Sequence, residues 1–272
     1  MAETAVFRRH NIPVEFLFQL FALVIAVIVV HGVYVSVVRP KAAEIMAEHR
    51  AQMAVDPGFV PERSIYVLIR DFEQETCFIL MLWAMAIMGY KAAGQVAERR
   101  LLQRDLIPVS EGMSILPEDT RQFSRPVQAL PDAERDHLLP RALLTALHRF
   151  RSTHNIQDVS TAVRAVCDGE SDRLDSELSM VRYIAWAIPS IGFIGTVRGI
   201  GEALSQAHQA VEGNISGVTE SLGVAFNSTF VALLLSIVLM FLMHQLQLLQ
   251  ERLVLDTQNY CDERLVQHLQ VR

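Results

Sequence analysis

The chain has 272 residues, of which 51% are hydrophobic, and it carries a formal net charge of −6. This composition favours a membrane protein, and acidic residues spread along the chain argue against nucleic-acid binding. Cys77, Cys167 and Cys261 lie far apart and the nine histidines form no ligand-like pair, so no metal site, disulfide framework or bound cofactor is expected.

Four segments are predicted to cross the membrane, each close to the roughly 20 mainly apolar residues that a helical span requires. Residues 16–38 and 221–245 contain no Asp, Glu, Lys or Arg. Residues 183–207 are interrupted by two charged side chains. Residues 76–97 qualify as a span if the ammonium group of Lys91 extends toward the interface while the helix continues.

The distribution of basic residues predicts the orientation, because Lys and Arg accumulate in cytoplasmic loops. Arg8 and Arg9 precede the first span, basic residues follow the second, and the connection between the last two spans has neither Lys nor Arg. The predicted cytoplasmic segments are therefore residues 1–15, 98–182 and 246–272. The predicted periplasmic loops are residues 39–75 and 208–220.

The large cytoplasmic segment reads as helical. Residues 108–140 are rich in proline and are expected to be irregular. Helical periodicity returns in "RALLTALHRF" and continues after Asp158, a suitable N-cap residue. The C-terminal segment places Leu242, Leu246, Leu249 and Leu253 on one stripe of a helix. The sequence thus predicts an all-α integral membrane protein, with a helical cytoplasmic domain between its second and third transmembrane helices.

The third span contains an unusual polar and flexible stretch, "AIPSIGFIGTVRGIGEAL", at residues 187–204. Pro189 cannot donate a backbone hydrogen bond to Ala185 and should bend the helix. Four glycines allow close helix packing, and the Gly195–Gly199 spacing matches a small-xxx-small contact. The predicted packing glycines are Gly192, Gly195, Gly199 and Gly201.

Polar residues of the last two spans form a candidate ion pathway. Thr196 lies in the third span, and Asn227, Ser228 and Thr229 lie in the fourth. Because the two helices are antiparallel neighbours, these groups are expected at similar depth, where hydroxyls and amides can line a hydrated path. Alternatively, the Thr196 hydroxyl bonds to the Gly192 carbonyl of its own helix.

Arg198 and Glu202 are charged residues within the predicted third span, and isolated charges there are costly. Their i, i+4 spacing allows an ion pair within the membrane. The alternative is that both lie in water at the outer interface. No span has Asp or Glu at its centre. If the chain conducts ions, the titratable carboxylate is therefore expected on another chain.

At these residues the sequence resembles the MotA/TolQ/ExbB family, the ring-forming subunits of ion-driven membrane motors. "PSIGFIGTVRGI" is similar to that family's P-x-x-G-x-x-G-T-V-x-G-I core, and "AFNSTFVALL" to its paired segment with a polar threonine. The resemblance covers residues 187–245. Arg198 departs from the pattern, because the family often has an aromatic or apolar residue there.

The resemblance implies a non-enzymatic motor or stator subunit in the bacterial inner membrane. Five copies would surround two copies of an ExbD/TolR/MotB-like partner, whose single span carries a membrane aspartate. Thr196 and Thr229 would line the pore opposite that aspartate, and ion flow would drive rotation. The expected ion is H⁺, with Na⁺ the alternative. A non-conducting scaffold or receptor and an autonomous channel or transporter remain the alternative functions, and the process that is powered cannot be read from the sequence.

Overall fold

The computed structural model describes residues 14–55, 62, 64–108, 113–211, 213 and 215–271. These residues are almost entirely helical and contain no strand, only an isolated bridge between Ile115 and Leu269. Within them, four helical stretches are long and apolar enough to cross a membrane: Glu15–Met53, Phe72–Gln103, Ile156–Ser205 and Ser216–His268. The predicted all-α membrane fold with four spanning helices is therefore confirmed.

The chain divides into two compact units. Unit 1 comprises the residues up to Ile87 together with Val181–Phe241, and unit 2 comprises Met88–Met180 together with Leu242–Arg272. Three long helices contribute residues to both units, namely α4 (Phe72–Arg99), α9 (Ser179–Ser205) and α11 (Ser216–Arg264). Unit 1 also contains α1 (Val14–Val33), a π-helical turn (Tyr34–Val38), α2 (Arg39–Val55), α3 (Ile65–Leu68) and α10 (Ala207–Val211).

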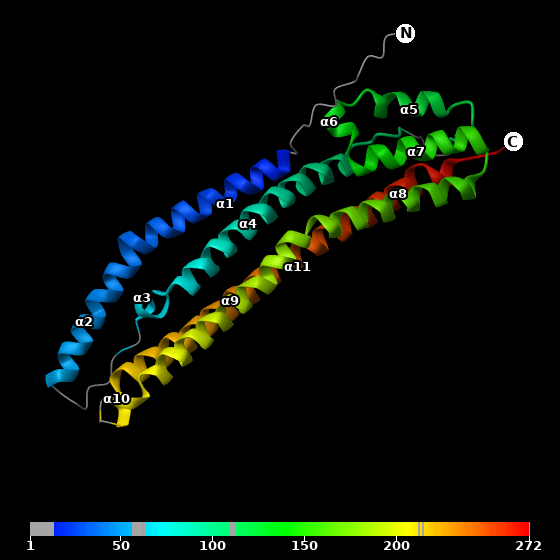
Figure 1. Ribbon diagram of the computed structural model, residues 1–272. Helices are drawn as coiled ribbons and strands as arrows, with labels where there is room; N and C mark the ends of the chain where they lie inside the picture. The colour runs from blue at the N-terminus through cyan, green and yellow to red at the C-terminus, as the bar shows by residue number, and fades with distance from the viewer. Residues whose placement is uncertain are drawn as a thin grey trace, which may run out of the picture. The chain divides into compact units, whose positions relative to one another are not determined.

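The first helical run extends well beyond the predicted span of residues 16–38. It passes from α1 through the π-helical turn into α2 without an interruption, and its direction changes between α1 and α2 (Figure 1). The π-helical turn ends at Val38, two residues before Pro40, which has no N–H to donate to the preceding turn. The 39–75 segment, predicted as a loop, thus contains both α2 and α3.

Three helices pack together in the part of unit 1 that concerns function. Helices α9 and α11 lie side by side, and α4 runs beside them (Figure 1). The Cys77 thiol of α4 lies 3.7 Å from the Ile188 carbonyl oxygen of α9. On the α1 side, the Trp83 indole N–H of α4 donates to the Gln19 carbonyl at 2.9 Å. Helix α4 is therefore packed against both α1 and α9.

Unit 2 is a helical bundle with its own apolar core. Besides the ends of α4, α9 and α11, it contains a 3₁₀ turn (Arg100–Gln103), α5 (Thr120–Gln128), α6 (Asp132–Arg135), α7 (Leu138–Thr153), α8 (Ile156–Glu177) and a second 3₁₀ turn (Val266–His268). The core includes Phe123, Leu143, Phe150, Val163, Cys261 and Leu269. The backbone N–H of Ile115 donates to the His268 carbonyl at 2.7 Å, which ties the C-terminal tail into this unit.

The expectation that residues 108–140 are irregular was partly wrong, because they contain α5, α6 and the start of α7. Helix α5 forms although Pro126 lies inside it. Its apolar residues Phe123 and Val127 are four apart and therefore share a face, and both are buried in the core of unit 2. This burial outweighs the backbone hydrogen bond that the proline removes.

Helix α4 continues past Lys91, and the charge of this lysine is paired within the chain. The Lys91 side chain is buried, and its ammonium nitrogen pairs with Glu177 of α8 at 2.9 Å. Both residues belong to unit 2. The charge of Lys91 is thus paired with a carboxylate within the chain.

Candidate ion pathway at the α9–α11 interface

Glycines bring the backbones of α9 and α11 into close contact. A Cβ atom added at Gly192 would lie 2.5 Å from the Ala232 Cβ, and one added at Gly199 would lie 2.7 Å from the Ala225 backbone nitrogen. Gly195 makes a similar approach to Ser228. These three predicted packing glycines therefore serve contact within one chain. Gly201 differs, because a Cβ atom added there would meet no described atom within 4 Å beyond the adjoining backbone of its own helix.

The break that Pro189 introduces into α9 is repaired by α11. Helix α9 remains helical through Pro189, which leaves the Ala185 carbonyl without its usual N–H donor. The buried Ser236 hydroxyl of α11 donates to this carbonyl at 3.2 Å. A side chain of the neighbouring helix thus satisfies a backbone group that could not reach water inside a membrane.

Thr196 and Thr229 meet across the same interface, and their hydroxyl groups are in direct hydrogen-bond contact. The Thr196 hydroxyl also lies 3.3 Å from the Gly192 carbonyl oxygen of its own helix and 3.2 Å from the Ala225 carbonyl oxygen of α11. The Thr229 hydroxyl donates to the Gly192 carbonyl at 3.1 Å. Four oxygen atoms thus surround two hydroxyl protons, so lone pairs remain that can bind a cation or a water molecule.

This threonine pair lies at an edge with apolar surroundings. The nearby side chains of Phe193 on α9 and of Phe226 and Phe230 on α11 are exposed. Both threonine hydroxyls are only partly buried. An exposed apolar surface around two polar groups suits contact with lipid or with another transmembrane helix.

The other two predicted pathway residues do not join the threonine pair. Ser228 is buried, and its hydroxyl oxygen accepts a hydrogen bond from the Gln74 amide of α4 at 3.4 Å. Asn227 is partly buried and lies two positions before Thr229, about 200° away around the helix. The structure thus brings together Thr196 and Thr229, while Ser228 is directed toward α4.

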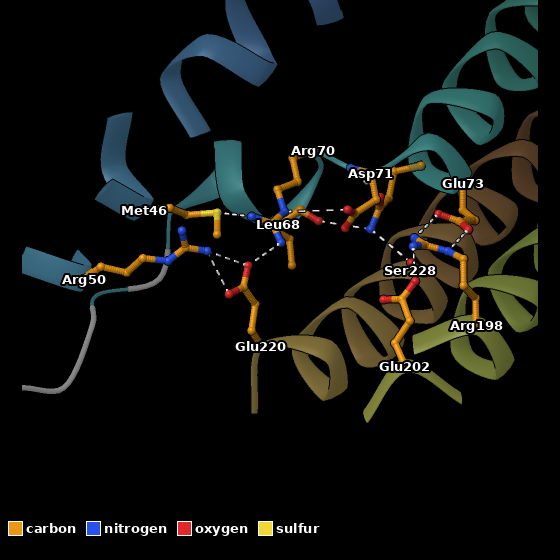
Figure 2. A network of polar contacts seen from close by, with 11 residues as sticks. Met46, Arg50, Leu68, Arg70, Asp71, Glu73, Arg198, Glu202, Glu220 and Ser228 are labelled. Atoms are coloured by element: carbon orange, nitrogen blue, oxygen red, sulfur yellow. Dashed lines mark hydrogen bonds and ion pairs between the residues drawn. The ribbon is translucent and has the colours of Figure 1, made fainter. Parts of the chain in front are cut away.

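Arg198 lies on the side of α9 that faces α4. It is two residues from Thr196, about 200° away around the helix, so the two side chains do not share a face. Its guanidinium contacts both Glu73 carboxylate oxygens, at 2.7 and 2.9 Å, and Glu202 at 3.0 Å (Figure 2). We call Arg198, Glu73 and Glu202 the charge cluster. It contains one cation and two carboxylates.

Glu73 is a residue of this cluster that the sequence analysis missed. Its side chain is only 11% exposed, compared with 46% for Glu202, so it is the better shielded partner of Arg198. The i, i+4 spacing pointed to Glu202, whereas Glu73 is distant in sequence and lies just before the predicted second span. The sequence did show a carboxylate at the start of a predicted span, but nothing in it indicated which residue that carboxylate would contact.

A second group of charges lies nearby in unit 1. Arg50 and Arg70 both pair with Glu220, at 3.0 and 3.2 Å (Figure 2). Asp71 lies 3.6 Å from the Arg70 guanidinium, and its Oδ2 atom is buried without a hydrogen-bond partner among the described residues. Burial raises the pKa of Asp71 above its usual range, although Arg70 acts in the opposite direction.

Glu75 is a second acidic residue that the sequence analysis did not single out. Its buried carboxylate pairs with Arg39 at 2.5 Å and contacts the His31 Nδ1 atom at 2.7 Å. Arg39 also lies over the Phe72 ring, 4.4 Å from its centroid. These contacts join α4 to α1 and α2. Glu75 therefore lies on a different side of α4 from Gln74, which contacts Ser228 of α11.

Comparison with known proteins supports the resemblance seen in the sequence. The model of the MotA/TolQ/ExbB proton channel family matches residues 134–259, which include the Thr196–Thr229 contact and the glycine-mediated interface. No curated protein and no solved structure matches the chain. Members of this family are subunits of channels and motors. Through residues 134–259, the chain is a member of the MotA/TolQ/ExbB proton channel family.

Proposed function

We propose that this multi-pass membrane protein is the ring-forming, ion-conducting subunit of a motor or stator. Five copies surround two copies of a single-span ExbD/TolR/MotB-like partner that carries a membrane aspartate. The ion is a proton, with Na⁺ as the alternative. Its flow down the electrochemical gradient across the bacterial inner membrane drives rotation and mechanical work at the cell envelope.

The observation that carries the proposal is the contact between the Thr196 and Thr229 hydroxyls at a partly open edge of the α9–α11 interface. Within the described residues, these hydroxyls bond to each other and to the carbonyls of Gly192 and Ala225. The carboxylates of the charge cluster are held on the other side of α9. This arrangement supports a pathway whose titratable carboxylate comes from a helix of another chain.

The exposed apolar side chains beside the threonine pair support the same conclusion. Phe193, Phe226 and Phe230 could pack against a partner helix, which would then place an acidic side chain close to the two hydroxyls. The glycines do not support the ring in the way the sequence suggested, because Gly192, Gly195 and Gly199 are used within the chain. Contacts between protomers would instead use the exposed apolar faces.

The chain segments that form unit 2 support the proposed topology. Residues 98–182 and 246–272, both predicted to be cytoplasmic, contribute to one apolar core, since Phe150 and Cys167 pack in the same cluster as Cys261. Two segments can share such a core only if they lie on the same side of the membrane. The intervening helices α9 and α11 then form one excursion across the membrane and back.

Proton flux into proteoliposomes tests the function. The samples are this protein alone, the complex that co-purifies from its native membranes, and that complex with Thr196→Val and Thr229→Val. Valine keeps the volume of threonine and removes the hydroxyl. We expect flux from the native complex, little flux from the protein alone, and about a tenfold or larger loss in the double variant, because a polar group of the path is lost.

Native mass spectrometry of the same preparations checks the assembly. Five copies of this chain with two copies of a single-span protein are expected, and the valine variants should retain that stoichiometry. Flux from the protein alone, unchanged flux in the double variant, or a stable monomer as the main species would contradict the proposal. Replacing H⁺ by Na⁺ as the driving gradient at a fixed membrane potential identifies the ion.

A further inference from the structure

A groove in unit 2, separate from the candidate ion pathway, has a distinctive lining. It lies between α5 and α7 and encloses about 500 Å³. On α5, Arg121 and Gln128 are seven residues apart and therefore share one helix face. On α7, His148 and Arg151 are three residues apart and line the opposite wall. The groove thus has cationic and polar side chains on both walls.

The charge of this groove is opposite to that of the chain as a whole. Its lining includes Arg121, Arg149 and Arg151, together with His148 and several hydroxyl groups, and no Asp or Glu among the residues that the structure describes. Four other hollows in the described surface each contain at least one carboxylate. Positive charge is thus concentrated at this groove in a chain of net charge −6, which favours the binding of an anion there.

Among the described residues, no carboxylate forms an ion pair with the three arginines of the groove. Elsewhere in unit 2, arginines such as Arg104 and Arg141 pair with carboxylates at 2.7 and 3.1 Å. In contrast, Arg121, Arg149 and Arg151 form no ion pair with any described residue. All three arginines are exposed, and all three contribute to the lining of this one hollow. An anion bound there would offset their like charges.

The chemistry of the lining selects among anions. The planar guanidinium group presents paired N–H donors that match phosphate oxygens, and several guanidinium groups suit a ligand with more than one negative charge. The volume of the groove lies within the range of about 300–1,000 Å³ that is usual for small-molecule sites. Leu144 and Leu147 supply an apolar floor. We propose that the α5–α7 groove binds a small phosphate-bearing ligand, either a soluble compound of about nucleotide size or a phospholipid headgroup.

Binding of tripolyphosphate to the full chain tests this proposal. The protein is placed in nanodiscs of neutral phosphatidylcholine and titrated by calorimetry at constant ionic strength, with thermal unfolding as a second readout. Saturable binding and an increase in unfolding temperature are expected, because a ligand that binds the folded state stabilises it. Sodium chloride, added so that it supplies the same concentration of negative charge as the tripolyphosphate, should neither bind saturably nor raise the unfolding temperature.

Two variants of matched charge locate the site. The groove variant combines Arg121→Gln, Arg149→Gln and Arg151→Gln, and should bind about tenfold more weakly for each guanidinium removed. The control variant replaces three other exposed arginines of unit 2, Arg100→Gln, Arg164→Gln and Arg252→Gln. It should bind within about twofold of the unmodified protein, since it keeps the groove intact.

Three outcomes decide the proposal without reference to ion flux. Absence of saturable binding, or an equal loss of affinity in the groove and control variants, overturns it. Loss confined to the groove variant supports it. Nanodiscs that contain phosphatidylglycerol then identify the source of the phosphate. If the groove binds a lipid headgroup, this lipid should weaken tripolyphosphate binding to the unmodified protein. If the groove binds a soluble ligand, the affinity for tripolyphosphate should not change.

Discussion

Helix α9 has two polar edges that differ in how completely their groups are satisfied within the chain. On one edge, Thr196 contacts Thr229 and backbone carbonyls, and its surroundings are exposed and apolar. On the other edge, Arg198 is held by Glu73 and Glu202 through three hydrogen bonds. The threonine edge retains lone pairs that can accept from water or bind an ion, whereas the charge of Arg198 is paired with carboxylates of α4 and of its own helix.

This difference distinguishes the edge proposed to conduct ions from an edge whose charges hold helices together. A charged residue inside a predicted span is by default a candidate for function, and Arg198 is such a residue. The structure instead gives its guanidinium two carboxylate partners within the chain. The uncharged threonines are the groups left available at the open edge. We therefore expect substitutions on the two edges to affect different measurements.

The largest effect is expected from the threonine edge. Thr196→Val combined with Thr229→Val should reduce proton flux about tenfold or more while leaving the assembly intact, because only hydroxyl groups are lost. Thr76→Val is the matched control, since among the described residues the Thr76 hydroxyl donates only to the Phe72 carbonyl of its own helix. A comparable loss of flux in Thr76→Val would remove the special status of the threonine edge.

The glycine face between the two edges should be sensitive to added volume. Gly192→Ala would place a methyl group 2.5 Å from the Ala232 Cβ and is expected to destabilise unit 1 by about 1–3 kcal/mol, as overpacking usually does. Gly201→Ala adds the same methyl group in open space and should be nearly neutral. Thermal unfolding in detergent compares them. Equal destabilisation would show that Gly201 has a neighbour in the assembly.

The arginine edge should affect stability more than ion flux. Glu73→Gln leaves Arg198 with one carboxylate and should cost about 1–2 kcal/mol, between the values for exposed and buried ion pairs. Glu202→Gln should cost less than about 1 kcal/mol, because this carboxylate is 46% exposed and makes a single contact. Unfolding temperature and flux are measured for both variants. A loss of flux in Glu73→Gln without loss of stability would place the charge cluster in the pathway.

The smallest effect is expected from the hydrogen bond between Ser236 and the Ala185 carbonyl that Pro189 leaves without its usual donor. Ser236→Ala should cost about 0.6 kcal/mol, a typical value for a hydrogen bond between membrane helices. In a Pro189→Ala background the same substitution should cost less, because residue 189 can then donate to Ala185 itself. A double-mutant cycle of unfolding temperatures measures this coupling. Equal costs in both backgrounds would mean that Ser236 acts independently of the proline.

Local patterns in the sequence were enough to predict several features of the fold. Long apolar stretches predicted four helices capable of spanning a membrane, and the order of glycines and threonines predicted the family. The i, i+4 spacing of Arg198 and Glu202 corresponds to an ion pair of 3.0 Å in the structure. Each of these signals depends on hydropathy or on spacing within one helix, and such information is complete within a short stretch of chain.

Tertiary structure decided which distant residues meet. The chain positions of Glu73 and Arg198 differ by 125 residues, those of Gln74 and Ser228 by 154, and those of Ala185 and Ser236 by 51. No spacing rule connects such pairs, because they depend on which helix faces are buried together and in what register. The same packing directed three glycines toward α11 and placed Thr196 and Arg198 on opposite edges of one helix. The separation of the candidate ion pathway from the charge cluster could therefore only be read from the fold.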